Sequence, residues 1–166
     1  MYYDVMMNID AVAQEALVNV VSGTKMSVAL EPAKVESIAS GKLRYVGVGP
    51  GEAIPEGFYQ VFGHGREHVY KAVRKRIASS PNNMNGDPIG YEDPYYRQEL
   101  TRYFGVRYEY YFKDAIGSFS RFRGRNALLK KFGARKKELR RKMRAFNLER
   151  MSFDRYCEEL LILAAE

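Results

Sequence analysis

The chain has 166 residues, 46% of them hydrophobic, and a formal net charge of +7. This size and composition suit one compact domain, or two small ones, with a buried core that needs neither disulfides nor a structural metal. The single cysteine, Cys157, excludes an internal disulfide. No stretch approaches the roughly 18 apolar residues of a membrane span, and the chain does not open with a basic segment followed by an apolar run. We therefore expect a cytoplasmic protein.

The N-terminal region combines a predicted helix with predicted strands. Apolar residues recur at helical spacing from Ile9 to Val20, with Asn8 as a cap and Ser22-Gly23 as a stop. Four strand-like runs follow, separated by residues that break regular structure, at 26–30, 35–39, 43–48 and 58–62. They predict a small antiparallel sheet, either open or curled into a barrel.

A second helix is predicted from Arg66 onward, because Val69, Val73 and Ile77 fall four residues apart. Its remaining faces carry cations, which are Lys71, Arg74, Lys75 and Arg76. The helix ends before a polar stretch rich in Asn, Pro and Gly, and residues 81–92 are the candidate hinge. Residues 1–80 would then form the first structural unit.

The second unit, residues 93–166, is expected to be helical throughout. Asp93-Pro94 can start a helix and Gly105 can end it, and the next helix shows an apolar stripe through Tyr108, Phe112 and Phe119. A basic helix follows, with a break predicted at Gly133 and an apolar stripe made of Leu128, Phe132, Leu139, Met143 and Phe146. Ser152 caps a last helix whose Phe153, Tyr156, Cys157, Leu160 and Leu163 look inward. The predicted fold class is α+β, a helix with a small sheet or SH3-like barrel followed by a basic, mostly helical unit.

Charge is concentrated in residues 117–150, which hold thirteen Lys or Arg residues against two acids. This segment alone carries +11, so the rest of the chain is net acidic. A cation surplus this dense repels itself unless a polyanion neutralises it, which predicts nucleic-acid binding through phosphates with little sequence preference. The expected contacts are Arg121, Arg123, Arg125, Lys130, Lys131, Arg135, Lys136, Lys137, Arg140, Arg141, Lys142 and Arg144. Residues 119–126 alternate aromatic residues and Arg in an expected loop or helix start, so Phe122 is expected to touch a base. Lys71, Arg74, Lys75 and Arg76 form a second patch if the fold brings them alongside.

Two other partners use the same charges. An anionic membrane would need a wider apolar stripe and aromatic anchors, and the chain has no Trp, so we expect no membrane role. A scaffold protein, in a virion or a ribonucleoprotein particle, would place the basic face against nucleic acid or an acidic protein. The apolar run Leu160-Leu161-Ile162-Leu163 could also pair two chains. Nothing in the sequence separates DNA from RNA by a recognisable RNA-binding module, and we take DNA as the first expectation.

Enzymatic chemistry finds little support. His64 and His68 are four residues apart but lack a third metal ligand. The Gly47-Val-Gly-Pro-Gly51 run lacks the helix start that a phosphate loop needs. We therefore expect a protein that is not an enzyme and holds no cofactor or metal.

The run Gly41-Lys-Leu-Arg-Tyr-Val-Gly-Val-Gly-Pro-Gly51, followed by Glu56-Gly-Phe-Tyr-Gln-Val-Phe62, resembles the strands and glycine turns of small SH3-like barrels of the KOW or Tudor kind. A barrel beside a basic helical region is similar to small phage-encoded, nucleoid-associated proteins of the MotB type. The resemblance covers about a quarter of the chain and does not include a standard KOW signature. It implies a protein that coats or remodels DNA, associated with the nucleoid and modulating transcription, and it transfers no site residue.

Overall fold

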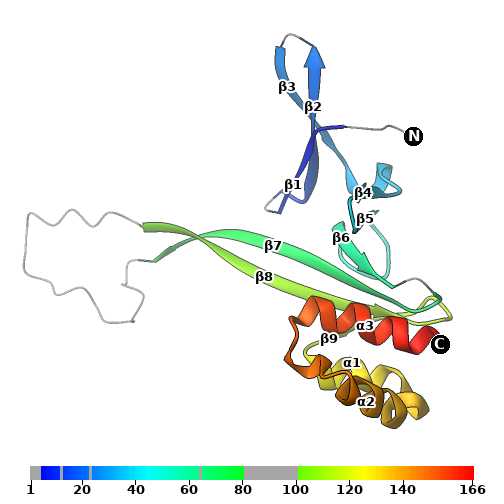
Figure 1. Cartoon of the computed structure of the whole chain (residues 1–166). Coiled ribbons are helices and arrows are strands. Elements are labelled where there is room, and N and C mark those ends of the chain that lie inside the picture. Colours follow the sequence, from blue (N-terminus) through cyan, green and yellow to red (C-terminus); the bar gives the residue numbers. More distant parts are fainter. Residues whose placement is uncertain (1–4, 12, 23, 64, 81–100) are drawn as a thin grey trace, which may run out of the picture.

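The structure is a computed structural model that describes residues 5–11, 13–22, 24–63, 65–80 and 101–166. Within these residues the protein is mostly sheet, with one antiparallel sheet of three strands, a second of six, and a helical part at the C-terminal end (Figure 1). The predicted fold that begins with a helix is therefore wrong. The expected hinge at 81–92 and the helix start at Asp93 lie outside the described residues.

Strands replace the predicted N-terminal helix. The first sheet contains, in order, β1 (Met7–Asp10), β2 (Glu15–Ser22) and β3 (Thr24–Leu30). Between β1 and β2 the Asp10 carboxylate accepts a hydrogen bond from the Ala13 N–H at 3.0 Å, and Gln14 has a φ of 60°. That left-handed conformation interrupts a right-handed helix, and the valines of β2 favour an extended backbone.

The second sheet is open and has a linear strand order. It contains β4 (Ile38–Ser40), β5 (Leu43–Val48), β6 (Gly57–Phe62), β7 (His68–Ser80), β8 (Thr101–Lys113) and β9 (Phe119–Phe122). The order is β4-β5-β6-β7-β8-β9, with β4 and β9 at the edges, so the alternative prediction of a small closed barrel is also wrong. The strand predictions at 26–30, 43–48 and 58–62 are confirmed, whereas only the last two residues of 35–39 belong to a strand.

The basic helix predicted from Arg66 onward is instead strand β7, which pairs with β8 from His68↔Lys113 to Ser80↔Thr101. Val69, Val73 and Ile77 are four residues apart, and this spacing places side chains on one face of a helix and equally on one face of a strand. β-Branched and aromatic residues fill both segments and favour the strand. Gly105, expected to end a helix, instead pairs with Arg76 within the β7–β8 ladder.

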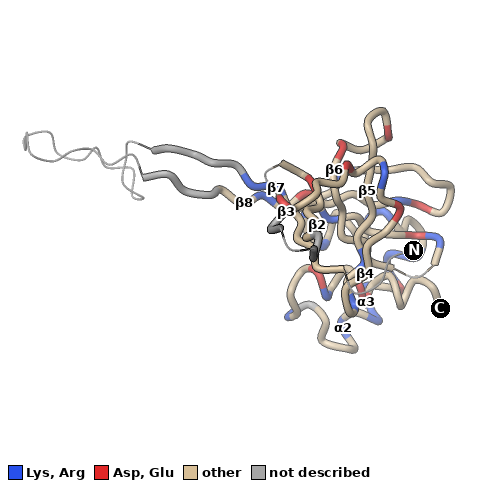
Figure 2. The backbone as a smooth tube through the Cα atoms, turned by 90° about the horizontal axis from the view of Figure 1, so that it is seen from above, with Lys and Arg blue, Asp and Glu red and all other residues tan. Residues whose placement is uncertain are grey.

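The β7–β8 hairpin extends beyond its neighbours in the sheet. Pairing with β6 stops at Lys71 and pairing with β9 stops at Tyr110, while β7 and β8 continue as a two-stranded ribbon (Figures 1 and 2). The first sheet rests on the free edge of β7 near the root of this ribbon. The Ala11 carbonyl accepts a hydrogen bond from the Lys75 N–H at 2.9 Å, and the Gln14 amide donates to the Val73 carbonyl at 3.0 Å.

Three α-helices and two short 3₁₀ turns form the C-terminal part. They are α1 (Arg125–Lys131), η2 (Gly133–Arg135), α2 (Lys136–Ala145), η3 (Leu148–Arg150) and α3 (Phe153–Ala165); a further 3₁₀ turn, η1 (Pro32–Lys34), precedes β4. The break at Gly133 is confirmed, with a φ of 53°. The Ser152 cap is also confirmed, because its hydroxyl accepts a hydrogen bond from the Arg155 N–H at 3.4 Å.

Candidate nucleic-acid interface

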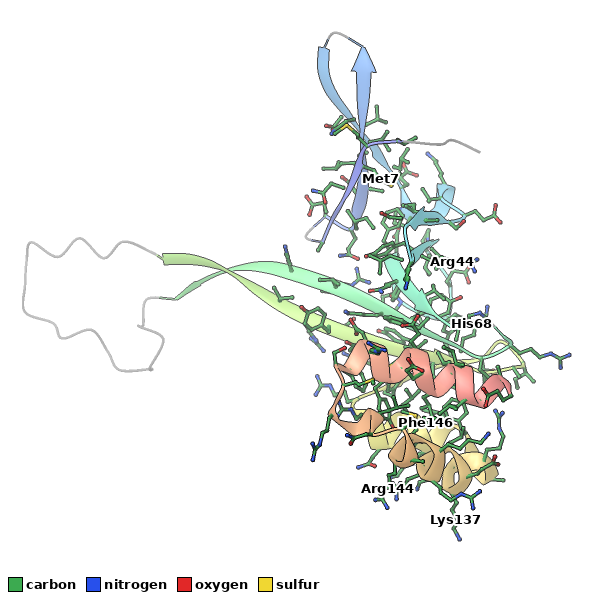
Figure 3. All side chains as sticks on the ribbon, viewed as in Figure 1. Met7, Arg44, His68, Lys137, Arg144 and Phe146 are labelled. Carbon is green, nitrogen blue, oxygen red and sulfur yellow. The ribbon has the colours of Figure 1, made fainter. Side chains whose placement is uncertain are left out.

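The helices α1 and α2 carry most of the basic segment on their outer surface. Residues 125–145 contain ten Lys or Arg residues and one acid, Glu138. Leu139 and Met143 of α2 are 2% and 1% exposed, whereas Lys137, Arg141 and Arg144 of the same helix are exposed. Figure 3 shows Lys137 and Arg144 on the side of the helical part that lies farthest from the sheet. The amphipathic pattern of the sequence thus places a row of cations outward.

Acidic side chains neutralise some of the predicted contacts. Arg121 pairs with Glu109 at 2.8 Å and Arg135 pairs with Glu67 at 2.7 Å. Lys142 lies 3.4 Å from Glu138 and 3.8 Å from Glu166. These three cations have part of their charge satisfied within the chain.

Within α1 and α2, five Lys or Arg residues form neither an ion pair nor a side-chain hydrogen bond among the described residues, and we call them the cationic wall: Lys130, Lys131, Lys136, Lys137 and Arg141. Four of the five are exposed, and Lys136 is half-buried. Two belong to α1 and three to α2, which are in contact with each other. The wall is therefore a surface of like charge whose neutralisation must come from outside the described residues.

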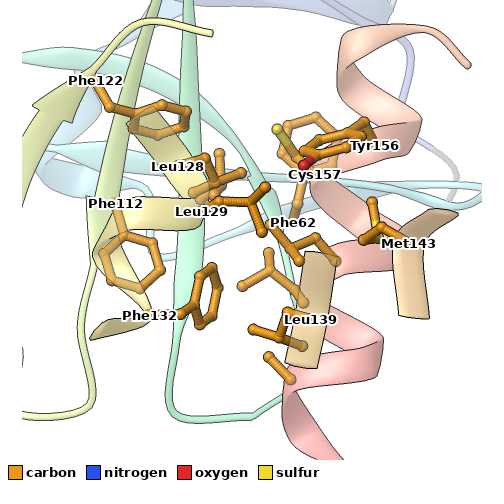
Figure 4. Packing of buried hydrophobic residues seen from close by; sticks show 14 of the residues in the cluster. Phe62, Phe112, Phe122, Leu128, Leu129, Phe132, Leu139, Met143, Tyr156 and Cys157 are labelled. Atoms are coloured by element: carbon orange, nitrogen blue, oxygen red, sulfur yellow. The ribbon is translucent and has the colours of Figure 1, made fainter. Parts of the chain in front are cut away.

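A continuous hydrophobic core supports the wall (Figure 4). Phe62, Val69, Phe112 and Phe122 of the sheet pack against Leu128, Leu129, Phe132, Leu139, Met143, Tyr156, Cys157 and Leu160 of the helical part. Such close packing fixes the backbone positions from which the wall side chains project. The apolar stripe expected for the basic helix is confirmed except at Phe146, which follows the end of α2 and is 64% exposed.

Two predicted contacts serve to hold the helices together. The Arg140 guanidinium donates to the Asn126 side-chain oxygen at 3.1 Å and so joins α2 to α1. Arg125 donates to the Met151 carbonyl, and its guanidinium lies 5.2 Å from the centre of the Tyr156 ring. Both arginines are half-buried, so part of their hydrogen-bonding capacity is used within the helical part.

Phe122, expected to touch a base, is a core residue and only 5% exposed. The prediction treated the alternation of Phe and Arg around it as a loop or helix start, whereas residues 119–122 form strand β9. Alternation in a strand sends Phe122 toward the helices and Arg121 toward the other face of the sheet. Arg121 is thereby separated from the cationic wall, and Arg123 is exposed just after the strand.

The second basic patch also divides between the two faces of β7. Lys71 donates to the Asp154 carboxylate at the start of α3, and the Tyr110 hydroxyl donates to the same carboxylate at 3.0 Å. Burial, and then the nearby Asp154 charge, raise the pKa of Tyr110 above its usual range. Arg74 lies on the opposite face, where it donates to the Glu56 carbonyl at 2.8 Å. Lys75 is exposed and shares the face of Lys71, so Arg74 is separated from these two lysines and they do not form one patch beside the wall.

Among the described residues no group of three or more His, Cys, Asp or Glu side chains could hold a metal ion. His64 lies outside the described residues, so its expected pairing with His68 is not placed. In the described part of the chain no helix is both long and apolar enough to cross a membrane.

Sequence reasoning did not single out Arg44, Tyr70 and Lys113, which lie near Phe119 in the second sheet. They lie on the face of the second sheet that is turned away from the helices. The available signal was the alternation in residues 107–113, where Arg107, Glu109 and Lys113 alternate with aromatic residues.

Comparison with known proteins gives no relative: no family model matches the chain, and neither the curated proteins nor the solved structures yield a match.

Proposed function

We propose that this protein binds nucleic acid, with DNA as its main target, through phosphate groups that contact the cationic wall. It does so without an enzymatic step and with little sequence preference, in a nucleoid-associated role that coats DNA or modulates transcription. The observation that carries the proposal is the cationic wall itself, five cations without an ion pair among the described residues. Lys and Arg that neutralise phosphates release condensed counterions, which supplies affinity for any sequence.

The spacing of the wall suits a phosphate backbone. Lys137 and Arg141 are one helical turn apart on α2, about 6 Å between their Cβ atoms. A straight helix with such a row fits along or into the major groove of B-form DNA, whereas the deep, narrow groove of A-form RNA admits no helix. This difference is the reason for favouring DNA.

Weak sequence preference follows from the side chains that are missing from this surface. Bases are read by Asn, Gln or Arg held at a fixed position. Within residues 125–145 the one amide side chain is Asn126, and its oxygen already accepts a hydrogen bond from Arg140. The wall itself contains no amide, and its one arginine, Arg141, has no hydrogen bond or ion pair among the described residues that would hold it at a fixed position for base recognition.

The test is a triple variant, Lys130→Gln, Lys137→Gln and Arg141→Gln, titrated against a fluorescent duplex of about 20 base pairs at several salt concentrations. Each lost phosphate contact lowers the slope of log K against log salt by about 0.9. We expect the slope to fall by about 2 to 3 and the affinity at low salt to fall by more than about tenfold.

A matched control removes the same net charge elsewhere, through Lys34→Gln, Lys42→Gln and Arg155→Gln. All three side chains are exposed and lie outside α1 and α2. We expect the control to keep most of the wild-type affinity and slope. Equal losses in both triples would show that net charge alone governs binding, and no loss in the wall triple would refute the proposal. Absence of any duplex binding would favour an assembly protein whose basic face meets an acidic partner.

A further inference from the structure

The second sheet has one face covered by helices and one that is largely open. Its helix-facing side contributes Phe62, Val69, Phe112 and Phe122 to the core. Strand register places the alternate side chains on the opposite side, which we call the open face. Its residues include Arg44, Tyr59, Tyr70, Lys113, Phe119 and Arg121.

The cover of the open face is confined to one end. Ile54, in the connection between β5 and β6, packs with Tyr59 and Tyr111, which are 0% and 7% exposed. Tyr70 and Phe119 lie next to this cluster but are only half-buried. Two aromatic rings thus remain in contact with solvent on the surface of a rigid sheet.

These two rings are held in place by their neighbours. Their centroids are 5.0 Å apart with an angle of 78° between the ring planes, and the centroid of the Tyr59 ring lies 6.2 Å from that of Tyr70. The Lys113 ammonium is 5.4 Å from the centre of the Phe119 ring. Fixed edge-to-face packing means that little side-chain freedom is lost when a planar ligand stacks on this surface.

Cations border the rings. Arg44 is exposed, and its charge acts on the Tyr70 hydroxyl, opposing the effect of burial on the pKa of that group. Arg44 and Lys113 form no ion pair among the described residues. Arg121 is held at 2.8 Å by Glu109, whose side chain is 13% exposed. The open face is therefore an aromatic surface within a positive border.

We infer that the open face binds single-stranded nucleic acid, with unpaired bases stacked on Tyr70 and Phe119 and phosphates contacting Arg44, Lys113 and Arg121. Aromatic rings combined with cations are the features with which single strands are bound without sequence preference. A duplex keeps its bases stacked on each other, so it has no base to offer these rings. This site goes beyond the proposed function, because it lies on a different surface from the cationic wall and takes a different form of nucleic acid.

The experiment uses the full chain and a fluorescent oligothymidylate of about 15 nucleotides, with a duplex of mixed sequence as the second probe. In the double variant Tyr70→Leu, Phe119→Leu we expect binding of the oligothymidylate to weaken by at least about tenfold, since stacking on each ring contributes to affinity. Duplex binding should change by less than about twofold, because phosphate contacts on the wall are untouched.

Tyr108→Leu is the matched control. This tyrosine is 56% exposed and pairs with Val73 in the same hairpin, but it lies on the helix-facing side of the sheet. It should leave binding of both probes unchanged. An equal loss of oligothymidylate binding in the control, or no loss in the double variant, would overturn the inference.

Ultraviolet cross-linking of the oligothymidylate to the unaltered chain, mapped by mass spectrometry, provides a test that does not depend on a variant that folds. We expect cross-links at Tyr70 or Phe119. Cross-links confined to residues 125–145 would overturn the open-face site while supporting the wall. Cross-links on the open face, together with unchanged duplex binding in the triple variant of the wall, would instead refute the proposed duplex binding and leave this inference standing.

Discussion

Replacing Asp154 with asparagine should destabilise the fold by about 2 kcal/mol. Asp154 lies in the first turn of α3 and accepts hydrogen bonds from Lys71 and from Tyr110, so it joins the helix to the sheet. The Lys71 side chain is only 11% exposed, whereas that of Asp154 is 36% exposed. Breaking a fully buried pair costs about 3–5 kcal/mol, and partial exposure of the carboxylate lowers this figure.

Removing the Lys71 charge should destabilise the fold less than removing the Asp154 charge. Lys71→Met keeps the apolar stem and leaves Asp154 with water, the Tyr110 hydroxyl and the N-terminus of α3, all of which stabilise a carboxylate. We expect a loss of about 1 kcal/mol or less, and the double variant should be more stable than Asp154→Asn alone. Equilibrium unfolding in urea, with the midpoint and slope measured for all three variants, checks this order. Equal losses of unfolding free energy in the two single variants would refute the reasoning, because leaving Lys71 without its partner would then cost no more than leaving Asp154 without its partner.

Three further predictions concern the core, the sheet and the pH range of stability. Cys157 is 0% exposed, and burial raises its pKa to about 12. A thiol reagent should therefore react with it at least about 100-fold more slowly in the folded protein than in protein unfolded by urea. Equal reaction rates would contradict this prediction. An added Cβ at Gly47 would lie 1.9 Å from the Pro32 carbonyl oxygen, so Gly47→Ala should lower the unfolding free energy by about 2 kcal/mol or more. Gly65→Ala is the control, because its added Cβ has its nearest atom at 3.8 Å and should change the unfolding free energy by less than about 0.5 kcal/mol. Thermal melting compares the two variants, and equal melting temperatures would contradict this prediction. Burial raises the pKa of Tyr59 from 10.0 to about 12, so between these pH values the folded state keeps a proton that the unfolded state has lost. The free energy of unfolding should therefore fall as the pH rises from 10 to about 12, and it should fall less steeply in Tyr59→Phe. Identical pH profiles for the two proteins would contradict this.

The C-terminal helices could be predicted from sequence because their signals agree with one another. Leu139 and Met143 are separated by one helical turn, the surrounding positions are charged, and Ser152 supplies a cap with no competing interpretation. Gly133 breaks the basic segment where its low helix propensity predicts. Local preference and tertiary packing here require the same structure.

The sheet could not be predicted with equal success, because its spacing is ambiguous. Val69, Val73 and Ile77 share a face in a helix and in a strand, and only their long-range pairing with residues 104–112 decides between the two. The same ambiguity hid the role of Phe122, since its direction depends on β9 being a strand. Such pairings join distant segments, and local composition rich in β-branched and aromatic residues favours a strand without showing which segment it pairs with.

For the candidate site, the sequence predicts where positive charge is concentrated but not which of the cations form contacts within the protein. Arg125 and Arg140 belong to the same basic segment as Lys137, yet both have side-chain contacts that hold the helices together. Such contacts involve Met151 and Asn126, which no charge count would single out. The five cations of the wall have no such contacts among the described residues, and they are the ones we propose as the interface.

The decisive measurement is a titration of fluorescent duplexes of unrelated sequence, with RNA duplex alongside, across a series of salt concentrations. If phosphates meet the wall of five cations, log K should fall linearly with log salt with a slope of about −4 to −5, and the slope should be the same for every DNA sequence. RNA duplex should bind more weakly. A slope near zero, or affinity that changes by orders of magnitude between sequences at one salt concentration, would contradict a phosphate-directed DNA-binding protein.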